Sequence, residues 1–352
     1  MQSASARWAS VLVAVLAVPF EARAWDRGTV TTFAVLPAGS SGPEGLEVGP
    51  DGRVYVTTFG FTSQGSASGP GQLFVFDARG GLERQVSISG SSPHLLGLRF
   101  QPVTGSLLVI DFGGGKVLQV DPVSGASSPF MTLPPALPHS GAGVGLNDLT
   151  FDRQGSVYVS DSFQGVVWKT GPAGGVATVW VDDPLLRTTG VPPFGANGLR
   201  FNRHETSLFV ANTGDDTIVR VPAEDGIAAG VPTVFTNSIN GADGLVIDEE
   251  DNLWVAANQA DEIVVVDPTG RAIAKLGDFD GVSARGTPVH LLFPASLRFS
   301  QKDLLVTNLA LNTNLFGFVT VDTAWSAQVS RYTVSRLRAR IPRRGDVESD
   351  ED

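Results

Sequence analysis

The stretch GVGLNDLTFDRQGSVYVSDS, residues 143–162, contains the pattern that decides the fold. Two short runs in which apolar and polar residues alternate are separated by a polar turn over residues 152–155. Alternation with a period of two predicts β-strands, and a turn between two such strands predicts a hairpin. An Asn–Asp pair, Asn147 and Asp148, lies just inside the first strand, which is otherwise expected to be buried. These two polar residues need an explanation.

The same hairpin pattern occurs six times along the chain. Each copy begins with small or polar residues followed by an anchoring leucine, and successive anchors are about 46–52 residues apart. The anchors are Leu46, Leu98, Leu149, Leu199, Leu245 and Leu297. A third strand, such as residues 262–267, and a weaker fourth strand, such as residues 82–88, follow in most copies. Four short antiparallel strands at this period predict one blade of a β-propeller, and the period of two excludes a helical solenoid.

The two ends of the repeat region are predicted to share a blade. Residues 29–37 form a strand pattern that precedes the first anchor, and the sixth copy lacks a fourth strand. Placing the first strand in the last blade removes two open sheet edges. The sequence therefore predicts an all-β, six-bladed β-propeller over residues 25–335, built from four-stranded antiparallel blades and closed by its N-terminal strand.

The N-terminal 24 residues have the pattern of a signal peptide. Arg7 precedes an apolar core over residues 8–20, and Ala22-Arg23-Ala24 forms a small-x-small cleavage site. The alternative is an uncleaved N-terminal anchor. Because the chain has no cysteine, the pattern predicts export to a bacterial periplasm or exterior, where the fold would not depend on disulfides.

The composition excludes several classes of binding partner and of chemistry. The chain has a net charge of −11, which argues against nucleic acid and against an anionic membrane surface. The absence of cysteine also excludes thiol catalysis and thiolate metal sites. After removal of the signal, no segment is expected to span a membrane, so a small-molecule substrate is the expected partner; the oligomeric state is left open. Residues 336–352, where arginines are followed by acidic residues, are expected to be a disordered tail.

One position of the repeat is expected to gather polar side chains at the centre of the ring. In a propeller the innermost strands line a central channel, so residues two before each anchor should converge. They are Glu44, Leu96, Asn147, Asn197, Asp243 and Ala295. Two carboxylates with two amide carbonyls suit Ca²⁺, with other divalent cations left open, whereas the lack of His and Cys disfavours zinc. The alternative is that Asn197-Gly198 and Asp243-Gly244 are only turn residues.

The six repeats, with PEG, LND, ANG and ADG at their openings, resemble the calcium-dependent six-bladed propeller hydrolases. This group includes gluconolactonase and the senescence marker protein (regucalcin), paraoxonase and diisopropyl fluorophosphatase. The resemblance covers nearly all of residues 29–335. It implies a hub calcium held by a Glu, two Asn and an Asp in that order, which here fall on Glu44, Asn147, Asn197 and Asp243. It also implies hydrolysis of a lactone or related ester, without fixing the substrate.

The expected mechanism is attack by water on a carbonyl polarised by the hub metal, with Asp243 or His94 taking the proton. His94, in SPHLLGL, is similar in place to a His proposed as the base in paraoxonase; the alternative is a His without a proton-transfer role. Gly45 stands after Glu44 where paraoxonase has an acidic ligand for a second calcium, although Asp148 does follow Asn147, so a second ion is left open. Two other classes are kept: a non-catalytic binding module like the NHL-repeat propellers, and a metal-free enzyme resembling strictosidine synthase.

Overall fold

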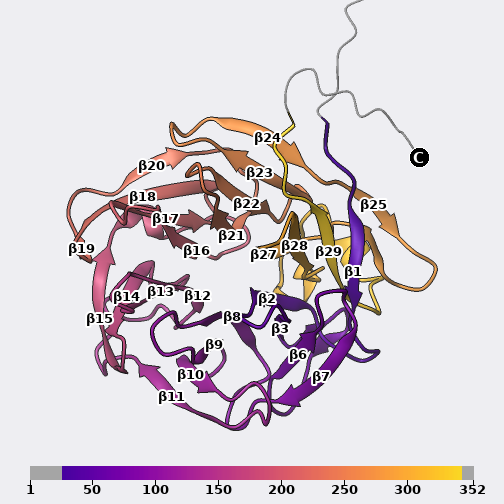
Figure 1. Cartoon of the computed structure of the whole chain (residues 1–352), viewed down its shortest axis with the longest axis horizontal. Coiled ribbons are helices and arrows are strands. Elements are labelled where there is room, and N and C mark those ends of the chain that lie inside the picture. Colours follow the sequence, from indigo (N-terminus) through magenta and orange to yellow (C-terminus); the bar gives the residue numbers. More distant parts are fainter. Residues whose placement is uncertain (1–25, 343–352) are drawn as a thin grey trace, which may run out of the picture.

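The computed structural model describes residues 26–342 and shows β-sheets arranged in a closed ring (Figure 1). Each of the innermost strands contacts the innermost strands of both neighbours, so the contacts run once around the ring without a gap. These strands are β2 (Pro43–Val48), β8 (Leu95–Phe100), β12 (Leu146–Phe151), β16 (Ala196–Phe201), β21 (Ala242–Ile247) and β27 (Pro294–Ser300). The predicted all-β propeller is therefore present.

Strand pairing within residues 26–342 forms six antiparallel units, and each unit runs outward from an inner strand. β2 is followed by β3 (Val54–Thr58), β6 (Gln72–Phe76) and β7 (Leu82–Ser87), and β8 by β9 (Leu107–Asp111), β10 (Lys116–Val120) and β11 (Ser127–Thr132). β12 is followed by β13 (Val157–Asp161), β14 (Val166–Gly171) and β15 (Gly174–Asp182), and β16 by β17 (Ser207–Asn212), β18 (Thr217–Glu224) and β20 (Thr233–Thr236). β21 is followed by β22 (Leu253–Ala257), β23 (Glu262–Val266) and β24 (Ala272–Leu276), and β27 by β28 (Asp303–Asn308), β29 (Thr333–Arg338) and β1 (Thr31–Val35).

Short elements lie in the connections between these strands. They are β4 (Phe61–Thr62), β5 (Gly65–Ser66), η1 (Pro184–Leu186), β19 (Ile227–Ala228), β25 (Phe279–Val282), β26 (Pro288–His290), η2 (Thr313–Phe316) and α1 (Thr323–Ser326). A brief parallel pairing of β11 with β15 joins two neighbouring units. No helical segment in residues 26–342 has the length and apolar character that a membrane span needs.

The N-terminal strand closes the last unit, as the sequence predicts. β1 pairs antiparallel with β29, and Thr31 lies opposite Arg336 in the register. β29 continues to Arg338, so the predicted end of the folded region at residue 335 is three residues too early. The predicted signal peptide, residues 1–24, and residues 343–352 of the predicted tail lie outside the described residues.

The turn in the decisive stretch shows why these residues form hairpins. Gly155 has a φ of 83°, a left-handed conformation that favours glycine, and its N–H donates to the Asp152 carbonyl at 2.9 Å. The Asp152 carboxylate accepts from the Ser156 N–H at 2.8 Å. Leu149 then lies opposite Val159 in the β12–β13 register, and both are fully buried. The anchoring leucine is therefore a core residue.

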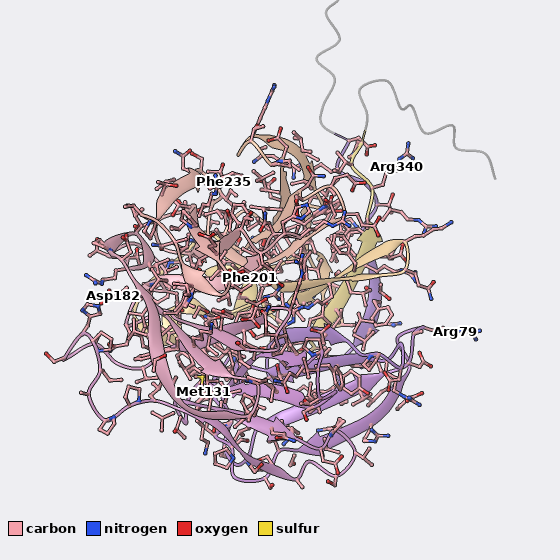
Figure 2. All side chains as sticks on the ribbon, turned by 60° about the vertical axis from the view of Figure 1, so that its left-hand side comes forward. Arg79, Met131, Asp182, Phe201, Phe235 and Arg340 are labelled. Carbon is pink, nitrogen blue, oxygen red and sulfur yellow. The ribbon has the colours of Figure 1, made fainter. Side chains whose placement is uncertain are left out.

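Apolar side chains fill the spaces between adjacent units. One cluster, for example, joins Leu46 and Phe74 of the first unit to Val334 of the last. Charged residues labelled in Figure 2, such as Arg79 and Asp182, lie at the rim of the ring. Because each unit buries both faces of its sheet against its neighbours, the ring holds the six inner strands in fixed positions.

Candidate functional site

All six inner strands carry a β-bulge at the same position of the repeat. In β12, Leu146 pairs with Asp161 and Leu149 pairs with Val159, so Asn147 and Asp148 together face a single residue of β13. A bulge redirects the side chains of the strand that contains it. The bulge therefore explains how a polar pair is accommodated inside a buried strand, and the alternating sequence pattern does not predict it.

The glycines beside the predicted ligands allow neighbouring strands to approach closely. A Cβ atom on Gly198 would lie 2.5 Å from the Asp243 carbonyl oxygen, and one on Gly244 would lie 2.5 Å from the Ala295 carbonyl oxygen. Both glycines lie within strands, β16 and β21, and neither has a positive φ. The alternative that the Asn–Gly and Asp–Gly pairs are only turn residues is therefore wrong.

The four predicted ligand residues line one cavity at the hub. All four are at least 95% buried. The volume open to water-sized molecules in this cavity is about 30 Å³, which is enough for an ion or a water. Its polar lining consists of Glu44, Asn147, Asn197, Thr213, Asp243 and Asn258. Its apolar lining consists of Phe59, Leu96, Pro192, Phe194, Phe293, Leu309 and Leu311.

Hydrogen bonds orient the amide groups so that each NH₂ end bonds to a neighbouring side chain. Asn147 donates through Nδ2 to the Ser162 hydroxyl at 3.2 Å, and Asn197 donates through Nδ2 to the Thr213 hydroxyl at 2.9 Å. Asn258 donates through Nδ2 to the Asp243 carboxylate at 3.0 Å. The carbonyl oxygens of Asn147 and Asn258 are buried and have no hydrogen-bond partner among the described residues. Such oxygens are suited to a cation.

The two carboxyl groups of the cavity are in an environment that disfavours their negative charge. Burial, together with the Asp243 and Asp148 charges, raises the pKa of Glu44 well above its usual range. Burial likewise raises the pKa of Asp243 to about 7. One oxygen of Glu44, Oε2, is buried without a hydrogen-bond partner within residues 26–342. A bound cation would offset both the desolvation and the repulsion of this pair.

Asn258 is a cavity residue that the sequence analysis missed. It directly follows β22, the second strand of its unit. The same position of the six units forms a second ring, occupied by Phe59, Phe112, Ser162, Thr213, Asn258 and Leu309. Three consecutive units place polar residues here, and the other three place apolar ones. The readable signal was the polar residue that directly follows the second strand in these three units, as in YVSDS and VAAN.

The structure does not bring His94 to the cavity. Its ring stacks on Phe61 with centroids 4.5 Å apart, and Nδ1 donates to the Phe59 carbonyl at 2.7 Å. The other nitrogen, Nε2, lies 3.3 Å from the Ser66 hydroxyl. Both ring nitrogens thus have partners, and His94 is not among the residues that line the cavity. Its role as a proton acceptor stays a prediction.

Asp148, the residue that left a second cation open, belongs to a cluster of buried charged side chains. Asp148 lies 2.7 Å from Arg200, and Glu47 lies 3.3 Å from both Arg99 and Arg298. Burial opposes the charge of Asp148, but Arg200, Arg298 and Arg99 outweigh it and lower the pKa of that carboxyl. Burial and the neighbouring guanidinium groups lower the pKa of Arg200 well below its usual range. With three cations and two anions, this layer has no need of a metal ion.

Two long connections form a cap over the cavity. In four units, the second and third strands are joined by four residues, but residues 59–71 and 309–332 make this connection in the first and last units. The two segments, which we call the cap, contact each other. Asn312 donates to the Ser63 carbonyl at 2.9 Å, and the rings of Phe61 and Phe316 have centroids 4.8 Å apart.

A pair of buried carboxyl groups connects the cap to a neighbouring hub loop. The charge of Asp322 acts on the carboxyl group of Asp261, which also accepts from the N–H of Phe293, a cavity residue, at 2.7 Å. Burial, together with the Asp322 charge, raises the pKa of Asp261 to about 8, and burial raises the pKa of Asp322 to about 6. Ionisation of both carboxyl groups at once is therefore disfavoured.

We expect Asp322→Asn to remove much of a pH dependence of stability. Because both pKa values are higher in the folded protein than in the unfolded chain, the pair stabilises the fold most below about pH 4. This contribution is lost as the pH rises through 6 and 8. The urea midpoint of the wild type should therefore fall more between pH 5 and pH 8 than that of the variant. Asp280→Asn, at an exposed position, is the control; equal profiles for Asp322→Asn and wild type would contradict the assignment.

Comparison with known proteins shows which family this chain resembles. Residues 89–277 match the profile of the SMP-30/Gluconolactonase/LRE-like region, and residues 31–59 match that of the strictosidine synthase-like N-terminal region. Lactonase drp35 of Staphylococcus aureus (strain MW2) is 30% identical over 141 residues, which is 37% of this chain and 41% of that protein. Lactonase drp35 of Staphylococcus haemolyticus is 30% identical over 155 residues, 40% of this chain and 45% of that protein. The chain thus matches less than half of the length of these relatives.

Solved structures share the fold over most of the chain. A luciferin-regenerating enzyme has a TM-score of 0.62 at 15% identity, covering 89% of this chain and 95% of that one. Regucalcin from Agrobacterium tumefaciens, a calcium-binding protein, has a TM-score of 0.58 at 17% identity, covering 85% and 92%. A gluconolactonase from Xanthomonas campestris has a TM-score of 0.59 at 14% identity, covering 89% and 90%. At these identities the likeness shows the fold.

Proposed function

The chain belongs to the SMP-30/gluconolactonase/LRE-like family, and from this premise we propose that it hydrolyses a lactone or a related ester with the help of a divalent cation at the hub, Ca²⁺ above all. The observation that carries the proposal is the set of buried oxygen atoms without partners among the described residues, on Glu44, Asn147 and Asn258. The drp35 relatives are named as lactonases, and regucalcin is named as a calcium-binding protein.

The residues of the cavity fit a calcium ion. Glu44, Asn147, Asn197 and Asp243 would hold it, and Asn258 lines the same cavity and bonds to Asp243. Carboxylate and amide oxygens are the donors that Ca²⁺ prefers. Within residues 26–342, no three His, Cys, Asp or Glu side chains gather into a metal site, so the donor set depends on its amides. A bound Ca²⁺ would supply the positive charge that stabilises the oxyanion developing on a lactone carbonyl.

The chain's own residues would then orient the reactants and move the proton. A water attacks the carbonyl carbon, a new carbon–oxygen bond forms, and the ring ester bond breaks to give a hydroxy acid. Asp243, whose carboxylate lines the cavity, takes the proton from the water and returns it to the departing alkoxide oxygen. Asn258 donates to this carboxylate and fixes its direction. His94 has no part in this scheme.

Export remains part of the proposal. A periplasmic or secreted protein meets Ca²⁺ at higher concentrations than a cytosolic one, so a site with modest affinity would suffice. The expected partner is a small-molecule substrate. A binding module of the NHL type would have no need of the free oxygens at the hub, and the metal-free alternative leaves them without a ligand.

The proposal is tested by a thermal melt and a lactone assay, each with excess Ca²⁺ and with a chelator. Ca²⁺ at a thousand times its Kd should stabilise the fold by about 4 kcal/mol, which corresponds to a shift in Tm of several degrees. Asn147→Ala should lose both the shift and the activity, because it removes an amide oxygen from the cavity. Asn237→Ala, an exposed asparagine, should keep both. Hydrolysis by metal-free protein, or neither shift nor hydrolysis, would refute the proposal.

A further inference from the structure

The hub cavity is divided into a polar side and an apolar side. In the third, fourth and fifth units, the residues that follow the second strand are Ser162, Thr213 and Asn258, and they bond to the candidate ligands. The equivalent residues of the second, first and last units are Phe112, Phe59 and Leu309. A ligand held by the free oxygens would therefore have its other side against carbon atoms.

The amide and hydroxyl groups on the polar side of the cavity bond to neighbouring groups, whereas the Phe, Leu and Pro side chains of the other side offer no hydrogen-bonding group. The NH₂ groups of Asn147, Asn197 and Asn258 donate to neighbouring side chains, and the Thr213 hydroxyl donates to the Ala242 carbonyl at 2.7 Å. A ligand whose hydroxyl groups lie against the apolar side would find no side-chain partner for them there. Each hydroxyl buried without a partner weakens binding, by about tenfold or more.

An aromatic network surrounds the mouth of the cavity and extends its apolar side outward. Phe59 contacts Phe112 at a centroid distance of 5.4 Å, and Phe112 contacts Phe163 at 5.7 Å. Phe163 contacts the cavity residue Phe194 at 5.5 Å. On the cap, Phe316 is 38% exposed and lies against Phe61. An exposed aromatic side chain at the mouth of a cavity offers a contact surface for an apolar group.

We propose that this site takes lactones with an apolar alkyl or aryl substituent and discriminates against polyhydroxylated sugar lactones. The inference rests on the proposed function and adds its substrate class. Apolar side chains of the cap, such as Leu309 and Leu311, line the same cavity as the candidate ligands. These side chains would then pack on the substituent, which improves transition-state binding about fourfold for each methylene that they bury.

The test compares three lactones: γ-butyrolactone, γ-decalactone and D-glucono-δ-lactone. We expect kcat/KM for γ-decalactone to exceed that for D-glucono-δ-lactone by at least about a hundredfold, with γ-butyrolactone between them. Phe316→Ala should raise KM for γ-decalactone several-fold and leave γ-butyrolactone unchanged. Trp325→Ala is the matched control, because this exposed aromatic lies on the same cap segment but contacts Phe279 instead of the network.

A binding measurement separates this inference from the proposed function. Calorimetry would compare 2-pentylcyclopentanone, a ring ketone that cannot be hydrolysed, with a polyhydroxylated cyclohexanone. Tighter binding of the alkyl ketone would uphold the apolar preference, whether or not any lactone is hydrolysed. The absence of lactone hydrolysis would refute the lactonase proposal alone. Equal hydrolysis of all three lactones, or tighter binding of the polyhydroxylated ketone, would overturn the inference while leaving hydrolysis intact.

Discussion

Glu44→Gln is expected to reduce lactone hydrolysis by about a hundredfold or more while making the metal-free protein more stable. The substitution removes one of the two carboxylates that line the cavity and keeps the shape of the side chain. Loss of a charged donor at a site that stabilises a developing oxyanion costs about 10²–10³ in rate. The same change removes a buried charge that is disfavoured by desolvation and by the nearby Asp243 carboxylate.

The opposite signs of these two effects make the prediction specific. In chelator, the Tm of Glu44→Gln should lie above that of the wild type. Excess Ca²⁺ should abolish or reverse this difference in Tm. Glu250→Gln, at an exposed position, should match the wild type in both conditions. Activity close to wild type, or a variant that is less stable in chelator, would contradict the assignment of Glu44 to a cation site.

The second large effect is expected at Arg200→Met, which should destabilise the fold by about 3–5 kcal/mol. Arg200 is 6% exposed and contacts the Asp148 carboxylate at 2.7 Å. Without the guanidinium group, that carboxylate loses its closest partner deep in the channel. The urea midpoint should fall accordingly, with no change in the dependence of stability on Ca²⁺.

A double-mutant cycle identifies the origin of this loss. Asp148→Asn combined with Arg200→Met removes both charges, so the double variant should recover much of the stability lost in Arg200→Met alone. Arg220→Met, on the outward face of β18, should change stability by less than about 0.5 kcal/mol. If the single and double variants are equally unstable, the loss comes from packing of the arginine stem and not from the ion pair.

Much of the architecture could be predicted because it is determined by a repeated local pattern. The anchoring leucines alternate with polar residues, so the strands and their period could be read directly, as could the pairing of the N-terminal strand with the last unit. The hub positions of Glu44, Asn147, Asn197 and Asp243 followed from the phase of the repeat. Their gathering in one cavity agrees with this expectation, whereas a bound calcium and the roles of these residues stay predictions.

What could not be predicted depends on contacts between units or on irregular segments. Asn258 belongs to the cavity because β22 ends beside the hub, and only the polar residue after the second strand indicates this in the sequence. His94 was placed by similarity of a short motif, but its ring contacts Phe61 and the Phe59 carbonyl and does not line the cavity. The cap segment 309–332 has no repeat pattern, so its contribution of apolar side chains to the cavity became visible only in three dimensions.

The repeated bulge has a consequence for how such a centre can change over generations. Leu96 and Ala295 sit in the same backbone irregularity as the four oxygen-bearing residues, so the irregularity does not depend on which side chain it presents. At this position each unit thus presents one side chain to the hub, while other residues determine its core packing. In evolution, the side chains at the centre of such a ring could therefore be substituted one at a time. Chemical groups could be added, removed or exchanged without a change in the backbone that holds them.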